Sequence, residues 1–247
     1  MRETRTERCR CSFLDRREAQ MGPFALGIDG LEAGPGDHLC GLYAGVRERD
    51  ELIVPFLRAG LRAGDKCICV VDGTEAAELV ATVGLDVAAS GRANGQQLDV
   101  IRSSDIYLRA GIFSAMEVIA SWKAAMSEVM YDSRFDLVRA VESWSLRDVV
   151  PGRNELLTLE SEMNRYLPLF PQVIVCLYDL ERFGGGIVVD LLKTHSRVLV
   201  GGAIIENPYC MTADQVLAAT EAGTLNAIDH DLEEVAQWCY DETIGSN

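Results

Sequence analysis

The chain has 247 residues, of which 48% are hydrophobic and 25% charged, and its formal net charge is −15. This composition is typical of a globular protein with one large domain. The excess of acidic side chains disfavours contact of the main domain with nucleic-acid phosphates or anionic membranes, because like charges repel. No segment reaches the roughly 18 apolar residues that a membrane-spanning helix needs.

The N-terminal segment, residues 1–33, is rich in arginine and lacks the apolar core of a secretory signal. We expect a partly disordered arm here, and a cytoplasmic protein. The chain contains eight cysteines but no Cys-x-x-Cys pair. In a cytoplasmic protein such cysteines are expected to be thiols, not disulfides.

From residue 36 onward, short apolar runs alternate with segments that have apolar residues at helical spacing. The apolar runs predict strands at 38–43, 66–72, 97–103, 135–143, 172–179 and 197–205. The helical spacing predicts helices at 47–62, 74–84, 111–131, 152–167 and 185–196.

This alternation indicates an α/β fold, with a mostly parallel central sheet flanked by helices on both faces. The runs at 172–179 and 197–205 are apolar throughout, which is typical of strands buried on both sides. We expect one domain at residues 34–211. Residues 212–247, which are acidic and without lysine or arginine from residue 214 on, are expected to form a helical extension.

Ligands of open parallel sheets bind beyond the carboxyl ends of the strands, so the residues there are candidates for a binding site. Glu142 is the most informative of them. It follows Val141 at the end of an apolar strand, where a buried charge needs a partner. The other strand-end residues are Tyr43, Asp72, Asp179, Glu206 and Asn207.

The first strand-to-helix turn reads GLYAGVRERDE. A nucleotide-binding P-loop would carry GxxxxGK[ST] here, whose backbone amides and lysine hold the phosphates. This turn has no GK[ST], and the acidic side chains of Glu48, Asp50 and Glu51 disfavour a triphosphate. We therefore expect a protein that is not an enzyme. The alternative is a degenerate nucleotide hydrolase in which Glu142 orients water.

His38 and Cys40 lie two residues apart, so a strand presents both on one face. Their chemistry suits a redox centre, a nucleophile with its base, or half a metal site, and the alternative is a packed pair without chemistry. Because the chain has only three histidines, we expect no histidine-rich metal site, and neither a metal nor a cofactor. His195 lies at the end of the predicted helix at 185–196, where the helix dipole favours a histidine.

Several sequence segments occur together in a recognisable order: GDHLCGLY, PFLRAGLRAGDKC, YLRAGIF, VESW, CLYD and IENPY. Over residues 34–211 the chain resembles the MEDS (DcmR-type sensory) family. The resemblance implies a RecA/KaiC-related fold without ATPase activity, and the sensing of small organic molecules, including hydrocarbon derivatives. Such domains are often fused to DNA-binding, histidine-kinase or anti-sigma-type ATPase domains. None is recognised here, so we expect a partner chain to carry the output.

The family pattern, in which His195 also matches, and the strand ends together give the expected ligand-binding residues: His38, Cys40, Tyr43, Glu142, Trp144, Tyr178, Asp179, Glu206, Asn207 and Tyr209. The leading interpretation is a non-catalytic small-molecule sensory domain that acts through a regulatory partner protein in signalling or transcription control. The alternatives are a degenerate nucleotide-binding ATPase-like protein, a thiol or haem redox sensor built on His38 and Cys40, and a scaffold whose acidic C-terminal helices bind a basic partner. Self-association as a homo-oligomer is left open.

Overall fold

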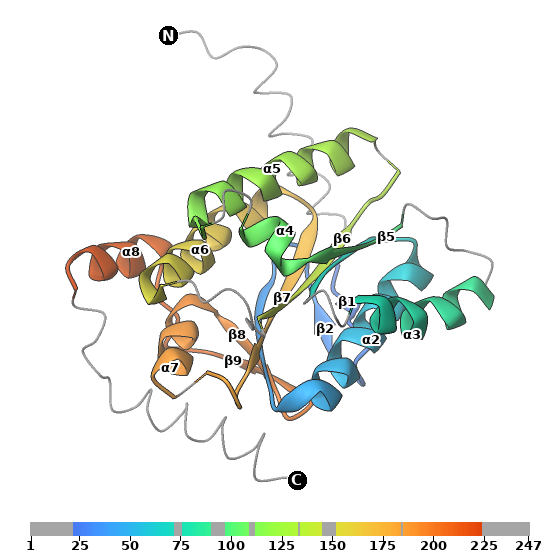
Figure 1. Ribbon diagram of the computed structural model, residues 1–247, viewed down its shortest axis with the longest axis horizontal. Coiled ribbons are helices and arrows are strands. Elements are labelled where there is room, and N and C mark those ends of the chain that lie inside the picture. Colours follow the sequence, from blue (N-terminus) through green and yellow to red (C-terminus); the bar gives the residue numbers. More distant parts are fainter. Residues whose placement is uncertain are drawn as a thin grey trace, which may run out of the picture.

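The structure of the chain is a computed structural model, which describes residues 22–71, 76–89, 97–108, 112–132, 134–144, 152–183 and 185–223. Within these residues, the central element is a seven-stranded sheet with helices on both sides (Figure 1). In spatial order its strands are β5 (Leu98–Arg102), β4 (Lys66–Val71), β6 (Val138–Trp144), β7 (Gln172–Asp179), β3 (His38–Tyr43), β8 (Arg197–Val200) and β9 (Ala203–Glu206).

The strands from β5 to β8 run parallel, and β9 pairs antiparallel with β8 at one edge. All residues of β3, β4 and β7 are buried, because these strands have neighbours on both sides and helices on both faces. This double burial accounts for their nearly unbroken apolar sequences. The expected α/β class with a mostly parallel sheet is confirmed.

Alternate residues of each strand point into two separate cores, one on each face of the sheet. The core on one face lies beneath α2 (Gly45–Ala63) and α3 (Ala76–Ala89), and we call this the α2 face. The core on the other face lies beneath a larger set of helices, and we call this the α6 face. Its helices are α4 (Ser103–Tyr107), α5 (Ala115–Asp132), α6 (Arg153–Tyr166) with its continuation η1 (Leu167–Leu169), and α7 (Gly185–Thr194).

The prediction of one continuous strand at 197–205 is wrong. The segment forms a hairpin instead, in which β8 turns back into β9 at Gly201 and Gly202. Both glycines have positive φ angles, 55° and 73°. This is the backbone conformation of a two-residue hairpin turn, which glycine adopts without a steric penalty. The apolar run therefore ends the sheet with an antiparallel edge strand.

A short two-stranded sheet, β1 (Phe24–Ala25) with β2 (Glu32–Ala33), lies before the expected start of the domain. It packs against the α2 face through the buried Leu26 and Ala33. Arg139 of β6 holds it there, because its guanidinium donates to the Ala25 carbonyl over 2.8 Å and lies 4.6 Å from the Phe24 ring centroid. Arg139 also pairs with Asp65 over 2.6 Å.

The last described helix, α8 (Ala213–Glu221), lies against α6. It begins at a capping box: the Gln215 amide donates to the Thr212 hydroxyl, and the Gln215 side chain accepts from the Thr212 amide. No helix among the described residues is both long and apolar enough to cross a bilayer.

Candidate functional site

The residues expected to bind a ligand at the strand ends divide between the two faces of the sheet. Tyr43 belongs to the α2 face, where its hydroxyl lies 3.2 Å from the Ser143 Oγ. Glu142 and Tyr178 alternate with these residues and lie on the α6 face. The sheet itself therefore separates Tyr43 from Glu142. The backbone of Trp144 pairs with Tyr178, its side chain is not described, and Asp72 lies outside the described residues.

The three expected residues from the last strand and its following turn have different surroundings. Glu206 is exposed and pairs with Arg197 over 3.1 Å at the sheet edge. Asn207 is buried and donates to two backbone carbonyls at the end of α7, including that of His195 at 2.7 Å. Tyr209 is half-buried against the core of the α6 face. Asn207 thus fixes the backbone of the His195 turn.

The turn that would carry a P-loop is short and its amides are occupied. Ala44 alone separates β3 from α2. The Ala44 amide donates to a Glu48 carboxylate oxygen over 2.7 Å, and the Gly45 amide lies 3.4 Å from an Asp179 carboxylate oxygen. Helix N-terminal amides bind phosphates in nucleotide-binding proteins. In this chain, internal carboxylates take that place.

Glu142 does have the partner that its buried position demands. Its carboxylate accepts a hydrogen bond of 2.9 Å from the Tyr107 hydroxyl, which α4 supplies. Burial, together with the nearby charge of Glu160, raises the pKa of Glu142 to about 7. Glu142 and Tyr107 therefore form a buried polar pair on the α6 face.

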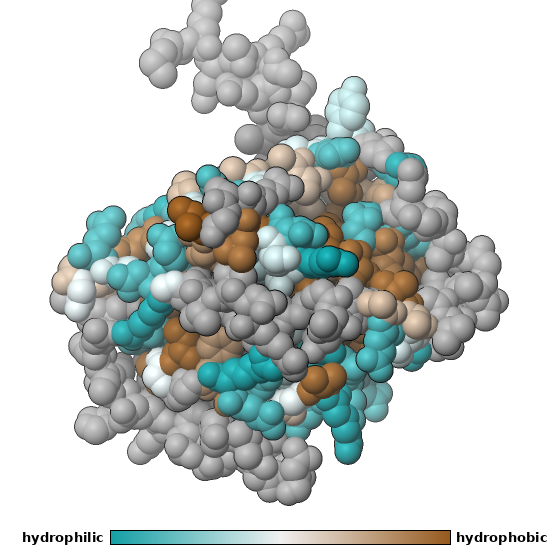
Figure 2. Space-filling model, viewed as in Figure 1, coloured by the Kyte–Doolittle hydropathy of each residue, from teal (hydrophilic) through white to brown (hydrophobic). Residues whose placement is uncertain are grey.

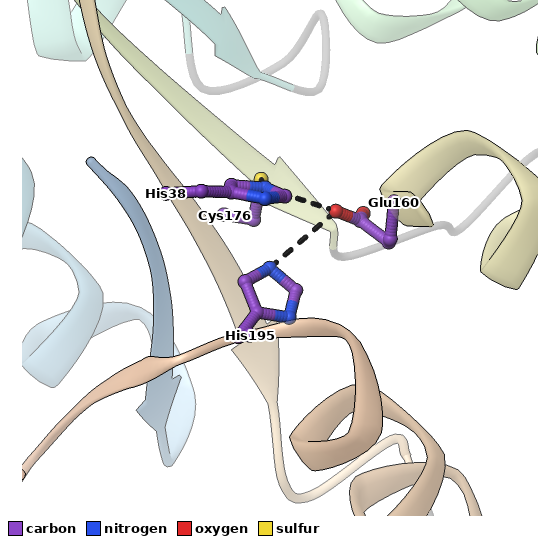
Figure 3. Close-up of side chains that lie close together, drawn as sticks. All are labelled: His38, Glu160, Cys176 and His195. Atoms are coloured by element: carbon purple, nitrogen blue, oxygen red, sulfur yellow. Dashed lines mark hydrogen bonds and ion pairs between the residues drawn. The ribbon is translucent and has the colours of Figure 1, made fainter. Parts of the chain in front are cut away.

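Four buried side chains from four separate elements meet in the middle of the α6 face (Figure 3). His38 comes from the start of β3, Glu160 from α6, Cys176 from β7, and His195 from the residue after α7. Their N, O and S atoms all lie within 4.8 Å of one another. His38 Nε2 is 3.1 Å from Glu160 Oε2 and 3.3 Å from Cys176 Sγ. We call these four residues the His–Glu–Cys cluster.

The hydrogen bonds behind the two imidazole rings fix which nitrogen faces the cluster. His195 Nδ1 lies 2.9 Å from the Leu191 carbonyl, and His38 Nδ1 lies 2.9 Å from Asn164 Oδ1. The orientation of the Asn164 amide follows from its nitrogen, which donates to a backbone carbonyl over 2.6 Å. Both partners of the rings are carbonyl oxygens that can only accept, so each Nδ1 carries a hydrogen. In the neutral rings, both Nε2 atoms then direct lone pairs into the cluster.

The charges in the cluster are strongly perturbed by burial and by each other. Burial by itself raises the pKa of Glu160, but hydrogen bonds and positive charge from His195 and His38 outweigh it and hold that pKa far below its usual range. Burial, aided by His38, lowers the pKa of His195, and burial raises the pKa of the Cys176 thiol well above normal. The Tyr178 hydroxyl donates to Glu160 Oε1 over 2.5 Å, which further favours the carboxylate.

Two buried atoms of the cluster have only the cluster's own imidazole and carboxylate groups as neighbours within the described structure, and no hydrogen bond forms between neutral Nε2 lone pairs and a carboxylate. They are Glu160 Oε2 and His195 Nε2, and they face each other at 3.4 Å. The exposed fraction of each side chain is 1% or less. A lone pair that faces a carboxylate is unfavourable unless something positive lies between them. The cluster therefore requires either a proton or a cation at its centre.

The sequence predicts that His38 and Cys40 lie on the same face of one strand. Both lie on the α6 face, as the spacing of two predicted, but His38 Nε2 contacts the sulfur of Cys176 on the neighbouring strand. Sequence reasoning missed Glu160 altogether. A signal for it existed, because Glu160 falls on the apolar side of its helix, between Leu156 and Met163.

A pocket of about 450 Å³ opens beneath α5, over the edge of the sheet formed by β4 and β5. At one end, Lys66 pairs with Asp99 over 2.8 Å. The rest of its wall is mixed. The larger apolar side chains are Ile68, Ile101, Ile106, Trp122, Val129 and Phe135, and the polar ones are Asp105, Ser121, Glu128 and Arg134. The size and lining are typical of small-molecule sites in proteins.

The surface in the view of Figure 2 carries separate apolar patches with polar side chains between them, not one continuous apolar area. Large exposed apolar side chains near α5 include Ile112, Met116 and Tyr131. Scattered exposure of this kind is normal for a globular protein. The pocket beneath α5 and the His–Glu–Cys cluster are therefore the stronger candidates for function.

The sheet order, the helices on both faces and the closed first turn define an α/β domain of RecA-like plan without a phosphate-binding loop. The model of the MEDS family (MEthanogen/methylotroph, DcmR Sensory domain) matches residues 37–196. This chain therefore belongs to the MEDS family, as its sequence segments predicted.

The chain is also similar to one curated protein and, at low sequence identity, to two solved structures. The transcriptional repressor DcmR of Methylorubrum extorquens is 26% identical over 189 residues, which cover 73% of this chain and 66% of the repressor. An ATPase of a bacterial type III secretion system overlaps 83% of this chain and 68% of its own, with 13% identity and a TM-score of 0.43. The assembled ATPase EscN of enteropathogenic E. coli gives 14% identity, coverage of 85% and 51%, and a TM-score of 0.38.

Proposed function

We propose that this chain is the ligand-sensing part of a transcription regulator and that a small organic molecule binds in the pocket beneath α5. The sensory family to which the chain belongs supports this role, as does its similarity to a transcriptional repressor. The observation that carries the proposal is the pocket itself, which at about 450 Å³ has the size of a small-ligand site. The chain spans less than two thirds of that repressor's length, so the output step is part of the proposal.

The lining of the pocket favours a neutral and mainly apolar ligand. Its apolar side chains, including Trp122 and Phe135, contribute apolar area, and its charged side chains include both acidic and basic groups, so no single ligand charge is favoured. The one buried cation, Lys66, already pairs with Asp99. A charged ligand would compete with this pair, whereas a neutral molecule leaves it intact.

The strand-end residues are less suited to hold such a ligand. The Tyr43 hydroxyl contacts Ser143, and the Asp179 carboxylate accepts from the Gly45 amide and pairs with Arg182 at 3.3 Å. The same arrangement at the first turn supports a non-catalytic role, because internal carboxylates contact the Ala44 and Gly45 amides and repel a triphosphate. We therefore propose that the chain neither binds nor hydrolyses ATP.

Signal transmission is proposed to run from α5 through α6 to α8. Helix α6 caps the start of α5, since Glu155 accepts from the Ala115 amide over 3.0 Å. Helix α8 in turn lies against α6. A ligand that binds one arrangement of α5 more tightly shifts the population toward it. A partner protein that contacts this helical layer would then read the shift.

Calorimetry with a panel of short-chain halogenated and methylated compounds tests the proposal. Ala125 lines the pocket, and its neighbour Ala124 is exposed and is not among the lining residues, so the two form a matched pair. We expect a compound that binds the wild type and the Ala124→Phe variant but not the Ala125→Phe variant. Equal binding by both variants, or silence across the panel, would contradict the pocket as the ligand site.

Mg-ATP serves as the competing ligand in the same series. We expect neither heat of binding nor phosphate release. Turnover that disappears in the Glu142→Gln variant would instead favour the degenerate hydrolase.

A further inference from the structure

We propose that the His–Glu–Cys cluster is a metal site, in which His38, Glu160, Cys176 and His195 bind one borderline-soft divalent cation such as Zn²⁺. The proposal departs from the sequence-based expectation of no metal and does not depend on the pocket beneath α5. Its basis is the geometry in Figure 3, where two imidazole rings and one carboxylate converge from three different elements.

The spacing of the four donor atoms suits a tetrahedral ion. Zinc lies about 2.0–2.3 Å from nitrogen, oxygen and sulfur ligands, which places neighbouring ligand atoms about 3.3–3.8 Å apart. Glu160 Oε2 lies 3.1 Å from His38 Nε2 and 3.4 Å from His195 Nε2. Cys176 Sγ is 3.3 Å from His38 Nε2. The remaining pairs of donor atoms lie within 4.8 Å of one another, so an ion fits after the side chains close in by up to about 1 Å.

The second layer of contacts is that of a metal site. Histidines that bind metals typically donate their other ring N–H to a carbonyl or carboxylate oxygen, which fixes the tautomer. His195 does so toward Leu191 and His38 toward Asn164. The carboxylate oxygen that remains is held by the Tyr178 hydroxyl. Each donor atom is thus oriented before any ion binds.

A divalent cation also resolves the two unpartnered atoms. Glu160 Oε2 and His195 Nε2 are buried without a hydrogen-bond partner and face each other. An ion between them accepts a lone pair from each atom, whereas without an ion a proton on His195 Nε2 has to take that place. These atoms therefore mark the position that a cation would occupy after displacing that proton.

Charge balance selects the class of ion. A cation of charge +2 with one thiolate, one carboxylate and two neutral imidazoles has no net charge, which limits the cost of burying it. Binding transfers the Cys176 thiol proton to solvent as the metal–sulfur bond forms, and no electron is transferred. Sulfur and nitrogen ligands favour Zn²⁺ and related transition ions over Mg²⁺ or Ca²⁺.

All four positions of a tetrahedral ion would be filled by protein side chains. Such closed sites are structural, not catalytic. The ion would tie β3 and β7 to α6 and to the end of α7. It would therefore fasten the helical layer of the α6 face to the sheet.

Titration of the chelator-treated full chain with Co²⁺ and Zn²⁺ tests the proposal. We expect one equivalent of Co²⁺ to give intense visible bands of a tetrahedral site and a near-ultraviolet thiolate-to-cobalt band, both removed by Zn²⁺. The Cys176→Ser variant should lose the thiolate band. The Cys69→Ala variant removes a buried thiol from the opposite face of the sheet and should behave as the wild type.

Asn164→Ala provides a second test if Cys176→Ser does not fold. This variant retains all four ligands but removes the acceptor behind His38, and we expect Zn²⁺ affinity to fall about 10- to 100-fold. Wild-type protein without a cobalt spectrum and without any response to Zn²⁺ would overturn the proposal. A thiolate band that persists in Cys176→Ser, or unchanged affinity in Asn164→Ala, would also overturn it.

Discussion

The two faces of the sheet bury charged groups in different ways. On the α2 face, Arg139 is fully engaged, since its guanidinium pairs with Asp65, donates to the Ala25 carbonyl and lies against the Phe24 ring. On the α6 face, Glu160 lies among neutral and titratable groups and leaves one oxygen without a hydrogen-bond partner.

The buried charge of Arg139 therefore has a structural role, whereas the surroundings of Glu160 indicate a functional one. A buried ion is expensive to desolvate, and a protein normally offsets that cost by satisfying every polar atom. Arg139 follows this rule within the chain. Glu160 and His195 meet this rule only when a proton or a cation lies between them.

The largest expected effect is on the α2 face. The Arg139→Met variant removes the cation that pairs with Asp65 and the donor that holds the β1–β2 sheet. We expect it to lower the free energy of unfolding by about 3 kcal/mol. Urea denaturation measures it, with Arg47→Met as the control. Arg47 forms an exposed pair with Glu51 and should change stability by less than about 1 kcal/mol. If Arg139→Met and Arg47→Met lowered the free energy of unfolding by similar amounts, the structural role of buried Arg139 would be contradicted.

The second-largest expected effect is the stabilisation of the α6 face by a bound metal ion. An ion that binds the folded state stabilises it by about 2.7 kcal/mol at 100 times its dissociation constant. We expect Zn²⁺ to raise the melting temperature of the wild type and of Arg139→Met. The melting temperature of Cys176→Ser should not respond. If all three respond alike, the added ion acts elsewhere.

The smallest effect tests whether the α6 face is sensitive to any loss of packing. Thr212→Ala removes the capping box of α8, which lies against α6. We expect a loss of about 1 kcal/mol in stability. Zn²⁺ affinity, measured by competition with a chromophoric chelator, should not change. Reduced affinity in this variant would mean that the cluster depends on general packing.

Most of the fold could be predicted from the sequence because its signals are local. The apolar runs at 38–43 and 172–179 became β3 and β7 with the predicted bounds. The edge of the sheet was harder. The run at 197–205 is apolar on both sides of Gly201 and Gly202, so its pattern does not reveal where the chain turns back.

The cluster could be predicted only in part, since it depends on contacts between distant residues. The sequence indicated the face on which His38 lies, but not that Glu160 and His195 would meet it. His38 and Cys176 are 138 positions apart, and only the parallel pairing of β3 with β7 brings them together. Glu160 on an apolar helix face was the local clue to a buried charge.

X-ray absorption at the zinc edge of the wild-type protein, loaded with one equivalent of Zn²⁺, tests the central claim most directly. The account predicts four-fold coordination, with one sulfur at about 2.3 Å and nitrogen or oxygen atoms at about 2.0–2.1 Å, two of them from imidazole. A spectrum of oxygen ligands alone, without sulfur or imidazole, would show that the buried cluster does not hold the ion.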